Sequence, residues 1–356
     1  NTIYNNSNID YDKLILATGS TPNKFGWPGQ DLKAVHGLYA YQDLESMEIY
    51  SDEKLKHAVV VGGGLIGIEM AEMFHSRHIP VTFLVREKSY WDKVLPPEES
   101  QMINRHIFEN GIRLRLATEL KEILGDDDGR VRAIVSNEGE EIPCQFVGLT
   151  AGVHPNIQFL KRSGIEMDRG ILVNDYLQTN IEDIYAIGDC AQMRTPKAGR
   201  MPIEAVWYTG RMMGEAVAYN VLSKPTGYNP GVWFNSAKFF DIEYQVYGNI
   251  KTVLEEGTAT LYWEHPKGKK SIRINYEKES GAVIGFNLMG IRYRHEVCEK
   301  WILNKTTIDE VLTNLGLANF DPEFFKEYEQ EIINIYNQTA EKQVRLRKRR
   351  GLSAVL

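Results

Sequence analysis

Three glycines at a fixed spacing constrain the fold of this chain more than any other feature. Gly62, Gly64 and Gly67 directly follow an apolar run at 58–61, which has the pattern of a buried strand. Apolar residues at helical spacing over 68–74 follow at once and predict an amphipathic helix. A strand, a glycine-rich turn and a helix in this order are typical of a Rossmann-like unit that binds a dinucleotide.

Each part of this turn has its own predicted task. Gly62 allows a tight turn, Gly64 lets the backbone approach a pyrophosphate, and Gly67 lets the helix pack closely on the strand. The start of the helix directs the N–H groups of Leu65 and Ile66, with a partial positive charge, toward the phosphates. The alternative is a glycine-rich strand–helix turn that binds no ligand.

The end of the next strand, predicted at 81–85, bears on the choice between NAD and NADP. An NAD site needs an acidic residue there to bind the ribose hydroxyls, but this chain has Val85 followed by Arg86. Arg86 suits a 2′-phosphate and Lys88 adds positive charge, which favours NADPH. The alternatives are a ribose-binding role for Glu87 and a solvated loop position for Arg86.

Composition excludes several classes of protein. The 356-residue chain has 41 Lys and Arg against 48 Asp and Glu, and the net charge of −7 argues against a protein that coats nucleic acid. A hydrophobic content of 43% with 25% charged residues is typical of a globular chain. No apolar run approaches the ~18–20 residues of a membrane span, and a signal-peptide layout is absent. We expect a soluble, cytoplasmic protein that binds neither nucleic acid nor membranes.

The three cysteines, Cys144, Cys190 and Cys298, lie far apart, with no CxxC pair and no spacing typical of metal ligands. We therefore expect neither a disulfide framework nor a structural metal site, and a reducing cytosol fits best. Cys190 lies beside Asp189 and is a candidate redox centre, but core packing is the favoured interpretation for all three thiols.

The remaining patterns predict an α/β part up to residue 230 and a separate antiparallel α+β domain after it. The α/β part has predicted strands at 13–17, 112–116 and 146–150, strand and turn signals up to 184–189, helices at 97–110 and 205–222, and an antiparallel meander over 119–146. Aromatic residues crowd a strand-rich stretch from 231 to 289, and a helical, charged tail ends at Arg350. One local pattern occurs twice, at 16–23 and 149–156, where a buried strand ends in a small residue, a glycine and Pro-Asn.

These patterns together resemble the FAD- and NAD(P)-dependent pyridine nucleotide–disulfide oxidoreductase superfamily. The resemblance rests on the two repeated strand ends, on Gly-x-Gly-x-x-Gly-x-Glu over 62–69, and on Ile-Gly-Asp-Cys-Ala over 187–191. It is greatest to the branch of ferredoxin and rubredoxin reductases, nitrite reductase large subunits, NADH oxidases and coenzyme A disulfide reductases. It implies a Rossmann-like NAD(P)-binding domain at 22–150, inserted in an FAD-binding α/β domain at 1–21 and 151–230, and a C-terminal interface domain at 231–356 that commonly forms a homodimer.

The resemblance also implies roles for individual residues. Glu69 lies near the nicotinamide, and Gly152 approaches the dinucleotide from the second repeated strand end. Asp189 holds the ribityl chain of FAD by a hydrogen bond, and the helix start after Glu204 faces the flavin pyrimidine edge. The implied FAD-binding residues are Ala17, Thr18, Gly19, Gly188, Asp189, Glu204, Ala205, Val206 and Trp207.

Two of these roles, and that of a further candidate, have plain structural alternatives. Asp189 is equally suited to a turn or helix cap, and Glu69 to a polar position in the first turn of its helix. Trp233, at the start of the interface domain, is a candidate to approach the flavin, with ordinary packing as the favoured alternative.

The implied function is that of a flavoprotein oxidoreductase. NAD(P)H bound at 62–67 passes hydride to FAD, and electrons then reach an unidentified acceptor. A small electron-carrier protein is a candidate partner, and the basic run 345–350 is either its docking site or a solvated helix end. The alternatives are a coenzyme A disulfide-type or persulfide reductase, whose N-terminal cysteine this sequence lacks, and a catalytically silent nucleotide-binding protein. The family's first glycine motif is also absent, so we expect weak or no FAD binding unless a missing segment supplies it.

Overall fold

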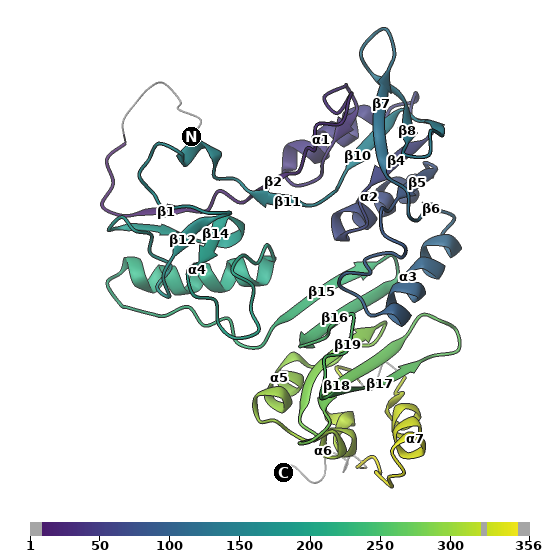
Figure 1. Cartoon of the computed structure of the whole chain (residues 1–356), viewed down its shortest axis with the longest axis vertical. Helices are drawn as coiled ribbons and strands as arrows, with labels where there is room; N and C mark the ends of the chain where they lie inside the picture. The colour runs from purple at the N-terminus through teal and green to yellow at the C-terminus, as the bar shows by residue number, and fades with distance from the viewer. Residues whose placement is uncertain (1–8, 322–325, 348–356) are drawn as a thin grey trace. The chain divides into compact units, whose positions relative to one another are not determined.

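The computed structural model describes residues 9–321 and 326–347, and the chain divides into two compact units (Figure 1). Unit 1 consists of Asn1–Gly62 and Leu120–Gly231, and unit 2 consists of Gly63–Glu119 and Val232–Leu356. The domain boundaries expected near residues 22, 151 and 231 stay a prediction. None of the helices in the described ranges is both long enough and apolar enough to cross a membrane.

Two parallel strand pairs in unit 1 confirm its α/β character. β1 (Leu14–Leu16) pairs with β13 (Ile184–Ala186), and β12 (Ile171–Val173) pairs with β14 (Ala191–Met193). Two 3-10 turns accompany these strands, η1 (Gln158–Leu160) and η2 (Gly188–Cys190).

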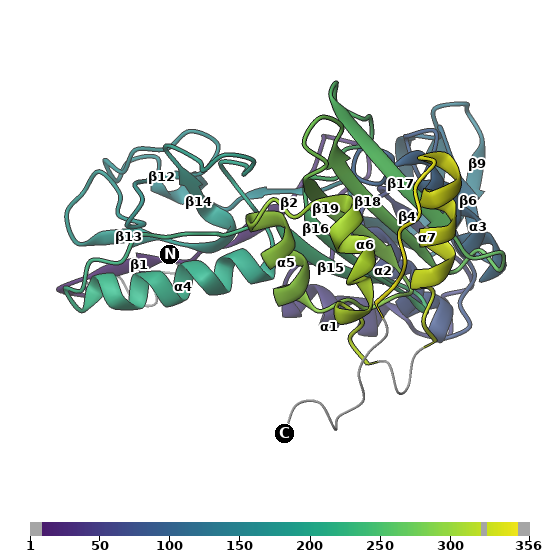
Figure 2. The same cartoon turned by 90° about the horizontal axis from the view of Figure 1, so that it is seen from below.

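Helix α4 (Trp207–Val221) covers one face of the β1–β13 pair. It runs alongside both strands in Figure 2, and its Met213 and Val217 share an apolar core with Leu16. Leu16 is buried, but Ile15 is 40% exposed, because successive side chains of a strand point to opposite faces. The strand that was expected to be buried therefore has one buried face only.

The two repeated patterns pair with each other. β2 (Ser20–Pro22) and β11 (Val153–Pro155) form the antiparallel ribbon that Figure 1 shows within unit 1. In each repeat, the side-chain amide of the final asparagine donates to a carbonyl in the turn of the other repeat: Asn23 to Ala151 at 3.2 Å and Asn156 to Thr18 at 3.3 Å. The repeats thus hold each other's turns with an approximate two-fold relation.

A five-stranded sheet carries the glycine turn, with the strand order β3-β10-β4-β5-β6. Its strands are β3 (Val35–His36), β4 (Ala58–Val61), β5 (Val81–Leu84), β6 (Arg113–Arg115) and β10 (Phe146–Leu149). The β3–β10, β10–β4 and β5–β6 pairs are parallel, as a Rossmann-like sheet requires. The predicted meander is confirmed by the antiparallel strands β7 (Leu120–Gly125), β8 (Val131–Ser136) and β9 (Glu141–Pro143).

Three helices alternate with the strands of this sheet along the chain. The predicted helices after the glycine turn and over 97–110 are confirmed as α2 (Leu65–Ser76) and α3 (Pro97–Glu109). Helix α1 (Tyr41–Tyr50) was not predicted, because Met47 is its one buried residue and no apolar periodicity marks it.

An antiparallel sheet with helices on one face forms the C-terminal part of unit 2, which confirms the predicted α+β character. The sheet order is β15 (Phe234–Phe239), β16 (Ile242–Gly248), β19 (Val283–Met289), β18 (Ser271–Glu277) and β17 (Thr258–Glu264). Its apolar core includes residues of α5 (His295–Leu303), α6 (Ile308–Thr313), η3 (Leu315–Leu317) and α7 (Glu329–Thr339). Figure 2 shows α5, α6 and α7 beside this sheet.

After α7 the chain turns at Glu341 and forms neither helix nor strand over 342–347, so the helical tail predicted to end at Arg350 is wrong for these residues. Val344 and Leu346 pack on the C-terminal core, and the Arg347 N–H donates to the Thr313 carbonyl at 2.8 Å. The basic residues 348–350 lie outside the described residues.

A buried ion pair joins α3 to the C-terminal sheet within unit 2. Glu99 is fully buried, and its carboxylate accepts two bonds from the Arg273 guanidinium, at 2.7 and 2.9 Å. Glu98 accepts a third bond at 2.6 Å, and the guanidinium lies over the Tyr262 ring. Burial raises the pKa of Glu99, and the bonds from Arg273 oppose this shift, so each charge depends on the other.

We expect Arg273→Ala to lower the free energy of unfolding by about 3–5 kcal/mol, because Glu99 is left buried without its counter-charge. The matched control is Arg292→Ala, which removes an ion pair with Glu243 whose side chains are 44% and 42% exposed. Such a surface pair contributes about 0–1 kcal/mol. Urea unfolding followed by tryptophan fluorescence measures both variants, and equal losses would contradict the assignment.

Candidate functional site

A side chain cannot be accommodated at Gly62, both because of its backbone conformation and because of the space around it. Its φ is +121°, and an added Cβ would lie 2.5 Å from the Thr150 carbonyl oxygen. Thr150 is held there by its N–H and its hydroxyl, which both donate to the Val61 carbonyl, at 2.8 and 2.9 Å. The ends of β4 and β10 therefore require glycine at this position.

Gly64 differs from Gly62, because a Cβ added to it would meet no atom of the described residues within 4 Å, its two chain neighbours apart. Gly64 is the extended N-cap of α2, and the first turn of that helix contains no acidic residue. The N–H groups of Leu65 and Ile66 thus begin a helix of 12 residues beside an open backbone surface. This surface fits the close approach of an anionic group such as a pyrophosphate.

Two cations contact Glu87 after β5. Arg86 donates to Glu87 Oε1 through Nε and Nη2, each at 3.1 Å, and Lys93 Nζ lies 3.0 Å from the same oxygen. Burial raises the pKa of Glu87, but the bonds from Lys93 and Arg86 outweigh it, and the pKa lies below its ordinary value. Glu87 therefore anchors two exposed cations. Lys93 was missed in the sequence because only the turns over 86–95 bring it back to Glu87.

Asp189 in η2 lies beside the turn at the end of β1. Its Oδ2 accepts bonds from the Ser20 hydroxyl at 3.2 Å and from the Tyr39 hydroxyl at 3.1 Å. The Tyr39 hydroxyl in turn accepts the Ser20 N–H at 2.6 Å, and a Cβ at Gly19 would collide with it. Burial raises the pKa of Tyr39, so it remains a hydrogen-bond donor. Tyr39 carried no sequence signal, since its contact to Asp189 spans 150 residues.

The other FAD-binding residues that the resemblance implies near Asp189 differ in their contacts. Ala17 is exposed, and the Thr18 hydroxyl donates to the Asn156 carbonyl at 2.8 Å. Gly19 has φ +65° and Gly188 has φ +70°, and both lie in the turns that contact or contain Asp189. The structure thus brings the turn at the end of β1 close to η2, which contains Gly188 and Asp189.

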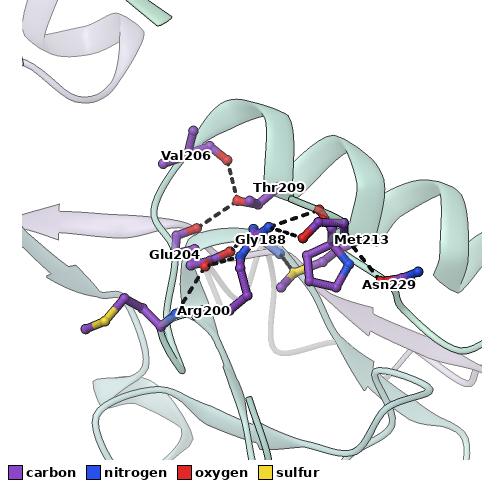
Figure 3. A network of polar contacts seen from close by, with 10 residues as sticks. Gly188, Arg200, Glu204, Val206, Thr209, Met213 and Asn229 are labelled. Atoms are coloured by element: carbon purple, nitrogen blue, oxygen red, sulfur yellow. Dashed lines mark hydrogen bonds and ion pairs between the residues drawn. The ribbon is translucent and has the colours of Figure 1, made fainter. Parts of the chain in front are cut away.

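Glu204 forms a buried ion pair with Arg200, as Figure 3 shows. Their side chains are 6% and 5% exposed, and the guanidinium donates to both carboxylate oxygens, at 2.7 and 2.5 Å. Arg200 also donates to the Pro230 carbonyl at 2.9 Å, which fastens the end of unit 1. The carboxylate of Glu204 is therefore engaged within the protein, and Arg200 is a partner that the sequence did not reveal.

Helix α4 starts later than predicted. Val206 is its extended N-cap, and Trp207 is the first helical residue, so the expected start at Ala205 is wrong. The Thr209 hydroxyl donates back to the carbonyls of Glu204 and Val206, at 3.0 and 2.8 Å, and holds the chain in this extended approach (Figure 3). Trp207 is 69% exposed.

The remaining candidates are Glu69, Gly152 and Trp233. Glu69 is exposed on α2, and Gly152, with φ +84°, accepts the Asn23 N–H in the ribbon at 3.0 Å. Trp233 precedes β15 and is half-buried, and its carbonyl accepts the Gly248 N–H at 2.7 Å. Their expected contacts with a nicotinamide or a flavin stay predictions.

The three cysteines are buried free thiols, which confirms their interpretation as core residues. The Cys190 thiol donates to the carbonyls of Leu16 and Ile187, at 3.5 and 3.3 Å. Burial raises the pKa of Cys144 to about 12 and that of Cys298 well above its ordinary value. None of these three is an accessible thiolate.

Comparison with known proteins identifies related chains. Rhodocoxin reductase from Rhodococcus erythropolis is 33% identical over 232 residues, which cover 65% of this chain and 54% of that protein. The NAD(P)H coenzyme A polysulfide/persulfide reductase from Pyrococcus horikoshii is 30% identical over 327 residues, which cover 87% and 72%. A ferredoxin reductase structure from Rhodopseudomonas palustris has a TM-score of 0.69 at 25% identity, with 79% of this chain and 68% of that chain covered.

Several relatives are considerably longer than the matched region. Three of them, at 33–35% identity, are spanned by this chain over 22%, 54% and 47% of their length. The family model of the pyridine nucleotide-disulphide oxidoreductases matches residues 2–214, more than half of the chain. The glycine turn, both repeated strand ends and η2 all lie in this matched region. The chain therefore belongs to the pyridine nucleotide-disulphide oxidoreductase family.

Proposed function

We propose that this chain binds a nicotinamide dinucleotide over residues 62–67 and takes part in hydride transfer from NAD(P)H to FAD. The contrast between Gly62 and Gly64 carries the proposal. Thr150 excludes a side chain at Gly62, so that glycine is required by packing, whereas the space around Gly64 is open. A turn that served packing alone has no need for a second, uncovered glycine at the start of a helix.

The electrostatics of the turn support a phosphate ligand. The helix start offers the N–H groups of Leu65 and Ile66, and no acidic residue in its first turn opposes an anion. Arg86 and Lys93 add two cations that are 64% and 69% exposed, and both are held by Glu87. This pair suits the 2′-phosphate of NADPH better than the ribose of NADH, because the carboxylate of Glu87 is already engaged by both cations.

Asp189 is the proposed contact to the ribityl chain of FAD. Both of its hydrogen bonds use Oδ2, and Oδ1 accepts none within residues 9–321 and 326–347. FAD, when bound, supplies the ring that accepts the hydride. Ala17, Thr18 and Gly19 belong to the same turn, whereas Glu204 can contribute only its backbone, because Arg200 occupies its carboxylate.

The domain division, the electron acceptor, the oligomeric state and the cellular location are also proposals. The paired repeats support crossings between an FAD-binding domain at 1–21 and 151–230 and an NAD(P)-binding domain at 22–150, with an interface domain at 231–356. The name of rhodocoxin reductase supports a small electron-carrier protein as the acceptor. A homodimer and a cytoplasmic location stay predictions.

A coenzyme A persulfide or disulfide reductase is the second candidate. The match to the Pyrococcus horikoshii reductase over 87% of this chain favours it. Such chemistry needs an accessible thiolate, however, and Cys144, Cys190 and Cys298 are all buried. The described thiols therefore do not support this candidate.

We expect Gly64→Ala to weaken NADPH binding by about tenfold or more, because its Cβ occupies the approach of the pyrophosphate. Its unfolding free energy falls by no more than about 1 kcal/mol, the cost of a poorer N-cap. The matched control is Gly214→Ala in α4, where the added Cβ also meets no atom within 4 Å. Nicotinamide fluorescence titration measures the affinities. Wild-type affinity in Gly64→Ala would contradict the proposed site.

Arg86→Ala is expected to raise the dissociation constant of NADPH by about tenfold or more, because a charged hydrogen bond to phosphate contributes about 1.5–3 kcal/mol. NADH binding should change less than about twofold. Arg194→Ala, which removes an exposed pair with Glu166, is the control. A preference of the wild-type protein for NADH, or equal losses for both dinucleotides in Arg86→Ala, would remove the role of Arg86.

Flavin chemistry is tested by adding FAD to the purified chain and following its absorbance under anaerobic conditions. The proposed reaction predicts that NADPH bleaches the flavin band in the wild-type protein. Asp189→Ala should need more FAD for the same bleaching, because the ribityl contact is lost. Flavin that stays oxidised in the presence of bound NADPH would favour a catalytically silent dinucleotide-binding protein.

A further inference from the structure

Tyr90 belongs to an aromatic cluster around Phe239 that joins the turn after β5 to the C-terminal sheet of unit 2. Its side chain is fully buried, and its ring packs edge-on against Phe239 of β15, at a centroid distance of 5.9 Å and an angle of 83°. Trp91 and Tyr244 contact the same phenylalanine, at 5.9 and 5.8 Å. We call these four residues the aromatic wedge. Burial of this much aromatic surface fixes the position of the Tyr90 ring.

The backbone of Tyr90 is fixed as well. The Ser100 hydroxyl on α3 donates to the Tyr90 carbonyl at 2.5 Å, and the Tyr90 N–H donates to Asn104 Oδ1 at 3.0 Å. Asn104 Nδ2 also donates to the Ser89 hydroxyl at 2.7 Å. Ring and backbone are therefore both held by elements outside the glycine turn.

The hydroxyl of Tyr90 reaches the glycine turn itself. It donates to the Gly64 carbonyl oxygen at 3.0 Å. The same oxygen accepts the Ile68 N–H at 3.3 Å, the first hydrogen bond of α2. Burial holds the pKa of Tyr90 well above its ordinary value, so the hydroxyl keeps its proton and remains a donor.

This bond sets the direction of a second group. The peptide between Gly64 and Leu65 is planar and trans, so its N–H points opposite to its carbonyl. A carbonyl held toward the helix by Tyr90 and Ile68 keeps the Leu65 N–H pointing out of the helix start. Gly64 has no side chain to restrain this peptide, and the space beside it is open.

We propose that Tyr90 is a positioning residue for the dinucleotide site, through which the C-terminal sheet orders the phosphate-binding turn. The inference rests on the proposed function and adds to it a part of the chain outside the family-matched residues. Phe239 belongs to β15, beyond the matched range 2–214, yet its packing holds the ring whose hydroxyl holds Gly64. The C-terminal sheet then contributes to affinity without touching the ligand.

Tyr90→Phe tests this inference, because it removes one hydroxyl and keeps the ring in the wedge. We expect the dissociation constants of NADPH and of ADP-ribose to rise together, by about three- to tenfold, since the defect lies at the pyrophosphate and not at the nicotinamide. Hydrogen exchange should accelerate at the amides of Leu65 and Ile66 in the ligand-free protein. Tyr244→Phe is the matched control, because it also removes a buried hydroxyl from the wedge, but one that makes no bond to Gly64 within the described residues.

The outcomes separate the inference from the function on which it rests. Weaker binding and faster exchange in Tyr90→Phe, with neither change in Tyr244→Phe, would support the inference. If the wild-type protein binds NADPH and Tyr90→Phe has the same affinity and the same hydrogen exchange as the wild type, the inference alone is overturned. Equal effects of both variants would assign Tyr90 to general core packing and overturn it too. A wild-type protein that binds no dinucleotide would overturn the proposed function and this inference with it.

Discussion

The close approach of β4 and β10 at Gly62 is the constraint on which the site depends. Thr150, at the end of β10, bonds twice to Val61 and leaves room only for hydrogen at the next α-carbon. The chain must therefore turn sharply at Gly62, with φ +121°, and it enters α2 three residues later, at Leu65. The first N–H groups of α2 therefore follow closely after the end of β4 along the chain. The packing of β10 on β4 thus requires the glycine at which the proposed anion-binding turn begins.

Buried polar contacts then hold the chain around this turn and around Asp189. Tyr90 fixes the Gly64 carbonyl from one side, while Tyr39 and Ser20 hold one oxygen of Asp189 in the other cluster. In both cases a tyrosine hydroxyl from a distant segment orders a short turn. A hydroxyl in a low-dielectric setting makes a directional bond, and its loss leaves a buried partner unsatisfied. These turns are ordered by partners that lie outside the recognisable motifs.

Local signals explain what could be predicted from the sequence. The glycine turn, the meander and α3 depend on short-range periodicity and turn chemistry, and all three are found where they were expected. Helix α1 was missed because it buries only Met47. The tail over 344–347 was wrongly predicted as helical, because Val344 and Leu346, which pack on the core, alternate there with basic residues. The partners of the site, such as Tyr39, Arg200 and Lys93, depend on the tertiary fold, which spacing along one chain does not reveal. Even the confirmed strand β1 differs in detail, since one of its faces leaves Ile15 exposed.

The central claim is that the 62–67 turn binds the pyrophosphate of a nicotinamide dinucleotide. Difference density from crystals soaked with NADPH tests it most directly. The account predicts a diphosphate within hydrogen-bonding distance of the Leu65 and Ile66 amide nitrogens, lying over the α-carbon of Gly64. Ordered dinucleotide density at any other place, with this turn left bare, would contradict it.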